Sequence, residues 1–131
     1  MLFFTLQSGH VGRLNTANGE MLIAKTPSDN TYPYGIRLNS AGVPWYVDFR
    51  GNRVGTVDPA TMKITEFPLP HADARPRRLT ITPDDIIYYS DFPRGMLGRF
   101  DPKTRQVKEW LSPGGPDSEP YAITHIGGIV W

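Results

Sequence analysis

Two aspartates, Asp48 and Asp91, lie 43 residues apart, and each follows a short run of aromatic and β-branched residues. A carboxylate at the mouth of a channel can bind a divalent cation or act as a base. The alternative is a role in the turn, because an Asp side chain readily bonds the backbone amides of the loop that follows it. Asp48 and Asp91 are therefore candidates for catalysis and metal binding, and equally for loop stabilisation.

The third candidate for acid–base chemistry is His125. It falls at a position of the repeat described below that holds Leu38 and Ile81 in the other units. A histidine there can act as a general base, or it can be a core residue with its hydrogen bonds satisfied. His10 and His71 fall at a strand edge and in a loop, where we expect them to be solvated.

Four further residues are candidates for ligand binding: Tyr34, Arg77, Arg78 and Tyr121. A guanidinium fork can receive a carboxylate or a phosphate, and a tyrosine offers an amphipathic contact surface. The alternative for the tyrosines is plain packing. The alternative for the arginines is an ion pair with an acidic residue nearby in sequence, namely Asp73, Asp84 or Asp85.

A repeat of 43 residues spaces these positions. Its clearest markers are three glycines, each inside the same short motif: Gly12, Gly55 and Gly98. Three aromatic residues keep the same step: Trp45, Tyr88 and Trp131. The period is the first fact to settle in such a chain, because it identifies a repeat architecture.

Both ends of the chain are in phase with this repeat. Residues 2–5 align with residues 45–48, which places Thr5 at the position of Asp48. Near the other end the third unit slips by one residue at Pro120 and regains the register before the final tryptophan.

Each unit contains four short segments with strand character, separated by turn signals. In the best-defined unit these segments are 77–82, 86–90, 96–101 and 106–111. Four strands in a repeat of this length are typical of a blade of a β-propeller, a four-stranded antiparallel sheet. The sequence therefore predicts an all-β fold. Its parts are 1–32 (three strands of a first blade), 33–75 and 76–119 (two whole blades), and 120–131 (the first two strands of a fourth).

About three blades do not close a ring, because propellers have four to eight. Open sheet edges and uncovered blade faces favour pairing with another chain. We therefore interpret the chain as a piece of a longer propeller, or as half of a ring completed by a second copy. In both cases we expect self-association as a homodimer or larger assembly.

Composition limits the class of partner. The net charge is +1, cysteine is absent, and no long block of like charge occurs. These features argue against a nucleic-acid partner or a membrane partner, and they provide no disulfide and no thiolate metal site. The apolar start lacks the basic region of a signal peptide, and its phase predicts a strand instead. The sequence does not determine the compartment.

Four motifs carry a family resemblance. They are Pro-Tyr-Gly-Ile (33–36), Val-Pro-Trp-Tyr-Val-Asp (43–48), Asn-Arg-Val-Gly-Thr-Val (52–57) and Ile-Thr-Glu-Phe-Pro-Leu-Pro (64–70). In order and spacing they resemble the blades of the streptogramin (virginiamycin) B lyase family, and the resemblance covers the whole chain. It implies a propeller that is typically seven-bladed, longer than this chain and often exported from bacteria. It also implies Mg²⁺ and the opening of a cyclic depsipeptide ester by elimination.

The chain departs from the family where that chemistry lies. In the family enzymes, the His of a Pro-His-Gly-Ile motif and glutamates near the channel supply the base and the metal ligands. The His position here holds Tyr34, Arg77 and Tyr121, and the Glu position holds Asp48 and Asp91. The resemblance therefore implies the scaffold, with Mg²⁺ as a possible cofactor and with catalysis unproven.

Three functions remain open on the sequence. The first is a lyase-like propeller segment that binds a small-molecule ligand in its channel. The second is a non-catalytic protein-interaction propeller. The third is part of a metal-dependent esterase or lactonase propeller.

Overall fold

The chain folds entirely into β-structure. The computed structural model describes residues 1–131 and contains thirteen strands, β1 to β13. No helix of the length and hydropathy needed to cross a membrane is present. The prediction of an all-β fold is confirmed.

The strands form four antiparallel sheets, each made of consecutive segments of the chain. The first sheet holds β1 (Leu2–Leu6), β2 (His10–Leu14) and β3 (Met21–Lys25). The second holds β4 (Pro33–Leu38), β5 (Pro44–Asp48), β6 (Arg53–Val57) and β7 (Ile64–Pro68). The third holds β8 (Pro76–Ile81), β9 (Ile87–Asp91), β10 (Met96–Phe100) and β11 (Val107–Leu111). The last is a hairpin of β12 (His125–Ile126) and β13 (Ile129–Val130).

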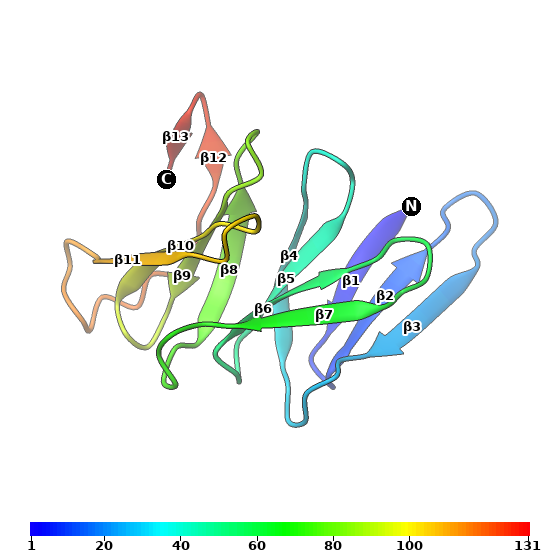
Figure 1. The fold of residues 1–131 in the computed structure, drawn as a ribbon, viewed down its shortest axis with the longest axis horizontal. Helices are drawn as coiled ribbons and strands as arrows, with labels where there is room; N and C mark the ends of the chain where they lie inside the picture. Colours follow the sequence, from blue (N-terminus) through cyan, green and yellow to red (C-terminus); the bar gives the residue numbers. More distant parts are fainter.

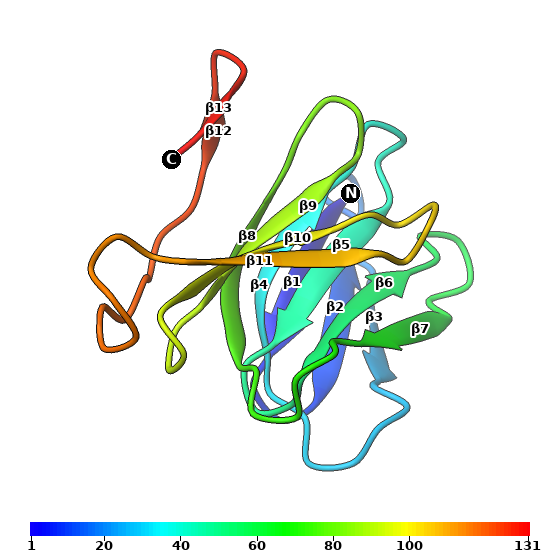
Figure 2. The same ribbon diagram turned by 60° about the vertical axis from the view of Figure 1, so that its left-hand side comes forward.

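The three larger sheets stand side by side and fan out like the blades of a propeller (Figure 1). β4 and β8 are the inner strands, because β4 packs beside both β1 and β8. The hairpin β12–β13 stands apart from the other sheets at the C-terminal end (Figure 2). The arrangement confirms propeller blades in an open, incomplete ring.

Each of the repeated glycines lies directly opposite an aromatic residue of the neighbouring strand. The pairs are Phe4–Gly12, Tyr46–Gly55 and Tyr89–Gly98. In every pair the aromatic ring covers the glycine so closely that a Cβ atom would overlap the ring atoms. Glycine allows this close approach because it has no side chain. The glycines therefore repeat every 43 residues because each large sheet contains one contact between an aromatic ring and the glycine backbone.

In two sheets a glutamate extends this contact across the next strand. The Tyr46 hydroxyl donates to Glu66 Oε1 at 2.8 Å, and the Tyr89 hydroxyl donates to Glu109 Oε1 at 3.0 Å. The first sheet has Phe4 in this place, and phenylalanine has no hydroxyl to donate. We call each set of facing residues an aromatic–glycine row: Tyr46–Gly55–Glu66 in the second sheet and Tyr89–Gly98–Glu109 in the third.

The core lies between neighbouring sheets. Trp45 is 7% exposed and stacks on Phe67 with ring centroids 5.7 Å apart, and Phe100 of the third sheet lies 6.1 Å from it. A second cluster, which includes Val11 and Val57, joins the first sheet to the second. These contacts hold the three blades at a fixed spacing, because apolar burial is the main favourable term in folding.

The first sheet corrects one prediction. In the pairing of β1 with β2, Leu6 takes the place that Asp48 has in the pairing of β5 with β6. The prediction that Thr5 takes it is therefore wrong by one residue. The cause is the turn length, because residues 7–9 join β1 to β2 whereas residues 49–52 join β5 to β6.

The one-residue slip predicted at Pro120 ends in the last hairpin, where the register of the repeat is regained. His125 pairs with Val130, as Ile81 pairs with Ile87 in the third sheet. The hairpin turns at Gly127 and Gly128, both with positive φ, and so its connection is shorter than that between β8 and β9. A tight turn of this kind favours glycine.

Candidate ligand-binding site

Asp48 is fully buried and serves the loops around it. Its carboxylate accepts the backbone N–H of Tyr32 at 2.7 Å and that of Arg50 at 3.1 Å. The Arg53 guanidinium donates to its second oxygen at 3.1 Å. Asp48 therefore joins the start of one blade to the loop after β5, as the alternative interpretation of the sequence describes.

Asp91 repeats this arrangement in the third sheet. It accepts the backbone N–H of Arg75 at 2.9 Å and the guanidinium of Arg94 at 2.8 Å. Burial raises the pKa of Asp91, while the Arg75 amide and the Arg94 charge oppose that shift. Arg94 also forms a two-bond contact with Glu109, at 3.1 Å for each bond.

The two aspartates do not fit a Mg²⁺ site, because their oxygens already accept backbone amides and arginine side chains. No group of three or more His, Cys, Asp or Glu side chains is arranged to hold a metal ion. Mg²⁺ takes oxygen ligands in an octahedral arrangement. We therefore derive no step through a metal at these residues.

The structure brings the four predicted ligand-binding residues together. Tyr34 and Arg77 are each the second residue of an inner strand, β4 and β8, and each follows a proline. Tyr121 follows Pro120 in the same way and lies shortly before β12. The two tyrosine hydroxyls lie 3.3 Å apart. They come from units on either side of Arg77, so three successive units meet at this point.

Side-chain hydroxyls position both tyrosines. Thr5 Oγ1 donates to the carbonyl of Tyr34 at 2.7 Å, and Ser90 Oγ donates to the carbonyl of Tyr121 at 3.0 Å. Each donor lies in the second strand of the preceding unit. Val47 holds the equivalent place in the middle unit and has no hydroxyl, so Arg77 receives no such bond.

Aromatic rings surround Arg77 instead. Its guanidinium carbon lies 4.2 Å from the ring centroid of Tyr121, 4.4 Å from Phe92, 4.9 Å from Phe49 and 5.3 Å from Tyr34. A guanidinium over the face of an aromatic ring is attracted by the ring quadrupole. Phe49 and Phe92 come from the loops after β5 and β9, at the same end of the blades as the tyrosines.

Arg78 completes this group. Its guanidinium carbon lies 4.8 Å from the Tyr34 ring centroid and 5.5 Å from that of Tyr121. The Tyr34 hydroxyl and the Arg78 guanidinium lower the pKa of Tyr121 to about 8. We call this group the arginine–aromatic rim, and its members are Tyr34, Phe49, Arg77, Arg78, Phe92 and Tyr121.

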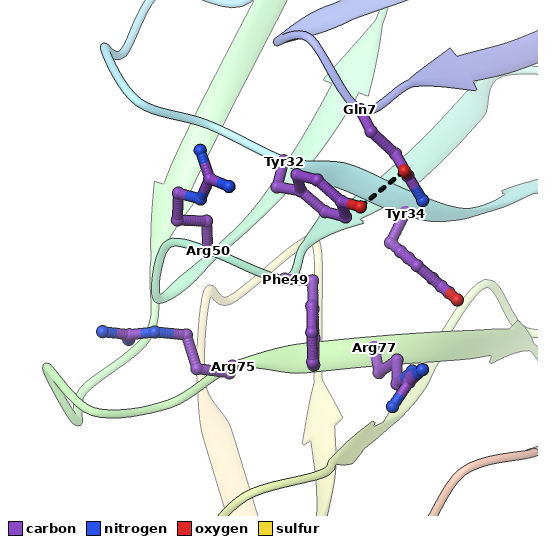
Figure 3. A pocket seen from close by; sticks show the side chains of 7 residues that line it. All are labelled: Gln7, Tyr32, Tyr34, Phe49, Arg50, Arg75 and Arg77. Atoms are coloured by element: carbon purple, nitrogen blue, oxygen red, sulfur yellow. Dashed lines mark hydrogen bonds between the residues drawn. The ribbon is translucent and has the colours of Figure 1, made fainter.

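An open pocket of about 510 Å³ adjoins the rim. It is lined by Gln7, Tyr32, Tyr34, Phe49, Arg50, Arg75 and Arg77. Figure 3 shows Phe49 near the middle of the pocket, with Arg77 and Tyr34 on one side and Arg50 and Arg75 on the other. The pocket thus combines flat apolar surfaces with cationic side chains, the composition expected of a site for a small molecule.

No carboxylate neutralises the arginines here. Arg77 and Arg78 form no ion pair with any residue of the chain, and the same holds for Arg50 and Arg75. The alternative of ion pairs to nearby acids is therefore wrong. Asp73 lies 3.6 Å from Arg94, and Asp85 accepts from Ser40. Asp84 lies with Asp85 in the turn between β8 and β9, at the far end of the strand.

His125 does not join the rim. It is the half-buried first residue of β12, opposite Val130, and corresponds to Ile81 at the end of β8, whereas Tyr121 lies before β12. The structure therefore places this candidate base at the other end of the blades from Arg77.

Sequence reasoning missed part of the site. Phe49 and Phe92 were visible as a pair at the 43-residue step, but nothing in the sequence indicated that their rings cover Arg77. Tyr32, Arg50 and Arg75 were also missed. They could have been found from their position, because each lies in a loop directly before or after a strand that carries a candidate residue.

Comparison with known proteins gives the wider setting. The profile of the Virginiamycin B lyase family matches residues 1–131. Among curated proteins, none matches this chain.

Solved structures of lyases share the fold. The virginiamycin B lyase of Staphylococcus aureus, a catalytically inactive histidine-to-alanine variant with quinupristin, is 27% identical with a TM-score of 0.84. That match covers 93% of this chain and 41% of the lyase chain. A streptogramin B lyase is 24% identical with a TM-score of 0.88, covering 98% of this chain and 43% of that one, and it shows the fold alone. This chain thus spans about two fifths of the length of these lyases.

Proposed function

This chain belongs to the virginiamycin B lyase family, and on that basis we propose that its arginine–aromatic rim binds a small organic ligand with a planar or peptide-like group. The observation that carries the proposal is the meeting of Tyr34, Arg77 and Tyr121, from three successive units, beside an open pocket. Its volume of about 510 Å³ suits a ligand of modest size. A related lyase has been crystallised with quinupristin, which supports a ligand-binding role for this scaffold.

The proposed role is binding rather than ring opening by these residues. Elimination requires a base that removes an α proton. At the position of the family's histidine the chain presents Tyr34, Arg77 and Tyr121, and an arginine remains protonated at any physiological pH. We therefore expect quinupristin incubated with the 131-residue chain to keep its closed ring. Elimination opens the ring without changing the mass, so chromatographic retention and the fragmentation pattern in tandem mass spectrometry measure the outcome. An opened product would contradict this assignment.

A neutral, peptide-like probe tests the binding role. N-acetyl-phenylalanine amide, titrated into the ¹⁵N-labelled chain, should shift the amide resonances of Tyr34, Phe49 and Tyr121 in a saturable way. Phe49→Ala should weaken binding several-fold, because it removes a wall of the pocket. Trp110→Ala is the matched control, since Trp110 is an exposed aromatic residue of β11 outside the pocket.

The test has a clear negative result. If neither this amide nor the corresponding carboxylic acid shifts the rim resonances at millimolar concentration, the proposal is wrong. Shifts confined to the region of Trp110 would contradict it equally.

We also propose that copies of this chain associate through the inner edge of β1. β4 and β8 cover this edge in the second and third sheets, whereas β1 has no inner neighbour within residues 1–131. Met1, Leu2, Ile36 and Leu38 line an apolar hollow of about 270 Å³ beside it. An unpaired strand edge favours pairing, and we propose that residues 120–126 of a second copy occupy it. Light scattering should give the mass of a dimer or larger assembly, and a stable monomer at micromolar concentration would contradict this.

A further inference from the structure

We infer that the ligand of the arginine–aromatic rim carries an oxyanion, a carboxylate or a phosphate, which Arg77 and Arg78 bind together. The inference rests on the proposed function and specifies the chemical class of the ligand. It follows from four features of the rim: uncompensated charge, fixed arginine geometry, neighbouring hydroxyl donors and the absence of competing carboxylates.

The first feature is the contrast between two groups of arginines. Arg53, Arg94 and Arg99 each form an ion pair with a carboxylate of the chain. The arginines of the rim and its pocket form none. Arg50 donates to an asparagine oxygen and Arg75 to backbone carbonyls, neither of which carries a charge. Arg13, Arg37 and Arg105 also form no ion pair, but they lie in three different units, whereas four unpaired arginines lie together at the rim and its pocket. Uncompensated positive charge is therefore concentrated at this end of the blades.

The second feature is the way in which Arg77 is held. Four rings surround its guanidinium and fix its position, but a ring quadrupole does not cancel a full charge. Its Nε is buried and has no hydrogen-bond partner. Apolar walls also lower the local dielectric, which strengthens the attraction between a bound anion and the guanidinium. An oxyanion is the ligand group that such an arrangement favours most.

The third feature is the pair of phenols. The Tyr34 and Tyr121 hydroxyls, 3.3 Å apart, lie beside Arg77 and Arg78 and can donate to an oxygen bound there. The Tyr34 hydroxyl and the arginines also lower the pKa of Tyr121 to about 8, which means that they favour a negative oxygen at this place. Donors that stabilise a phenolate also stabilise a carboxylate or phosphate oxygen.

The fourth feature is the position of the nearby acids. Asp48 and Asp91 are buried, and their oxygens are occupied by backbone amides and by Arg53 and Arg94. Neither forms an ion pair with Arg77 or Arg78. The rim would repel a cationic group, so it selects among ligands by charge as well as by shape.

A matched pair of probes tests this inference. N-acetyl-phenylalanine and its amide have nearly the same size and differ in the charge of one group. In ¹⁵N NMR titrations at pH 6.5, where Tyr121 remains protonated, the acid should bind about tenfold more tightly than the amide, as a charge-assisted contact to a guanidinium predicts. The acid's affinity should fall several-fold between low salt and 0.5 M salt.

Variants locate the effect. Arg77→Gln and Arg78→Gln should each reduce the acid's affinity toward that of the amide, while amide binding changes little. Arg77→Lys keeps the charge and should retain part of the preference even if Arg77→Gln disturbs folding. Arg105→Gln is the matched control, because Arg105 is an exposed arginine without an ion pair in the turn between β10 and β11.

A comparison with phenyl phosphate distinguishes a phosphate ligand from a carboxylate ligand. Stronger binding of phenyl phosphate than of the acid assigns the rim to a phosphate ester, and the reverse assigns it to a carboxylate. Equal affinity of the acid and the amide overturns the inference while leaving the proposed function intact. Absence of rim shifts with either probe overturns both. A preference for the acid that survives Arg77→Gln with Arg78→Gln also overturns the inference.

Discussion

The aromatic–glycine rows and the arginine–aromatic rim lie in the same blades, but the residues of the rows repeat from unit to unit whereas key residues of the rim do not. Along the rows the repeat keeps the same residues, Tyr46–Gly55–Glu66 and Tyr89–Gly98–Glu109, and the hydroxyl of each tyrosine has a partner. At the start of the inner strands the equivalent positions differ, and Arg77 keeps an unpartnered nitrogen. Positions that repeat maintain the sheet, whereas the positions that vary form the candidate site.

The largest effect should come from breaking a row. Gly55→Ala places a Cβ inside the Tyr46 ring, and overpacking of this kind costs about 1–3 kcal/mol of stability, with more for Gly55→Val. Urea unfolding followed by circular dichroism measures the loss. Thr65→Ala, at an exposed position of β7, is the control and should change stability by less than about 0.5 kcal/mol. Equal stabilities of Gly55→Ala and the control would refute the role of the contact.

A smaller loss should follow removal of one hydroxyl. Tyr46→Phe leaves the Glu66 carboxylate without its partner in the row and should cost about 1–1.5 kcal/mol, because Glu66 is only half-buried. Tyr46→Phe combined with Glu66→Ile reproduces the row of the first sheet, which has Phe4 and Ile23 around its glycine. The double variant should therefore lose less than the sum of the two single changes. Additive losses in this double-mutant cycle would show that the pair acts independently.

The tyrosines of the two regions should titrate differently. Burial raises the pKa of Tyr46 and Tyr89, whereas the Tyr34 hydroxyl and the arginines lower that of Tyr121 to about 8. Ultraviolet difference absorbance should show one phenol ionising near pH 8. The buried pair stays protonated while the unfolded chain loses those protons near pH 10, so stability is retained below about pH 10 and falls above it.

Two variants assign the pH 8 transition. Tyr121→Phe should abolish it, and Arg78→Gln should move it upward, since a hydrogen-bond donor and a positive charge are lost. The other groups that face Tyr121 are Tyr34 and Arg77. A transition unchanged in Tyr121→Phe would show that another tyrosine is responsible.

The smallest effect concerns the hydroxyl that holds Tyr121. Ser90→Val gives the third unit the residue type of Val47 and removes the bond to the Tyr121 carbonyl, at a cost of about 0.5–1.5 kcal/mol. The apparent pKa of Tyr121 should rise because its phenol is less firmly positioned. Unchanged stability together with an unchanged titration would mean that the bond does not position the rim.

The scaffold could be predicted because each repeated residue has a local reason. A glycine opposite an aromatic ring, and turn residues between short strands, leave a signal at a fixed period. The one error in phase, at Thr5, arose because a short turn moves a strand by one residue without disturbing the glycine spacing. Turn length is decided by loop geometry, which the periodic pattern does not record.

The site could be predicted only in part. Tyr34, Arg77 and Tyr121 could be singled out because they replace one another at the same position, but their contact depends on how neighbouring blades are spaced. The roles of Asp48 and Asp91 required knowledge of which amides point at them. Phe49 and Phe92 occupy the same position of the repeat, which suggested a structural role. Their contacts with Arg77, which has no counterpart in the other units, could not be predicted from that position.

The surroundings of Arg77 have a consequence for the evolution and engineering of such chains. Its neighbours come from three consecutive units, so the site depends on the order of the units as well as on their content. Duplicating, deleting or shuffling whole units would preserve the aromatic–glycine row inside each unit that remains and leave a foldable array. The same rearrangement would separate Tyr34 from Tyr121, and recombination could therefore erase or create binding specificity in one step without a single point substitution.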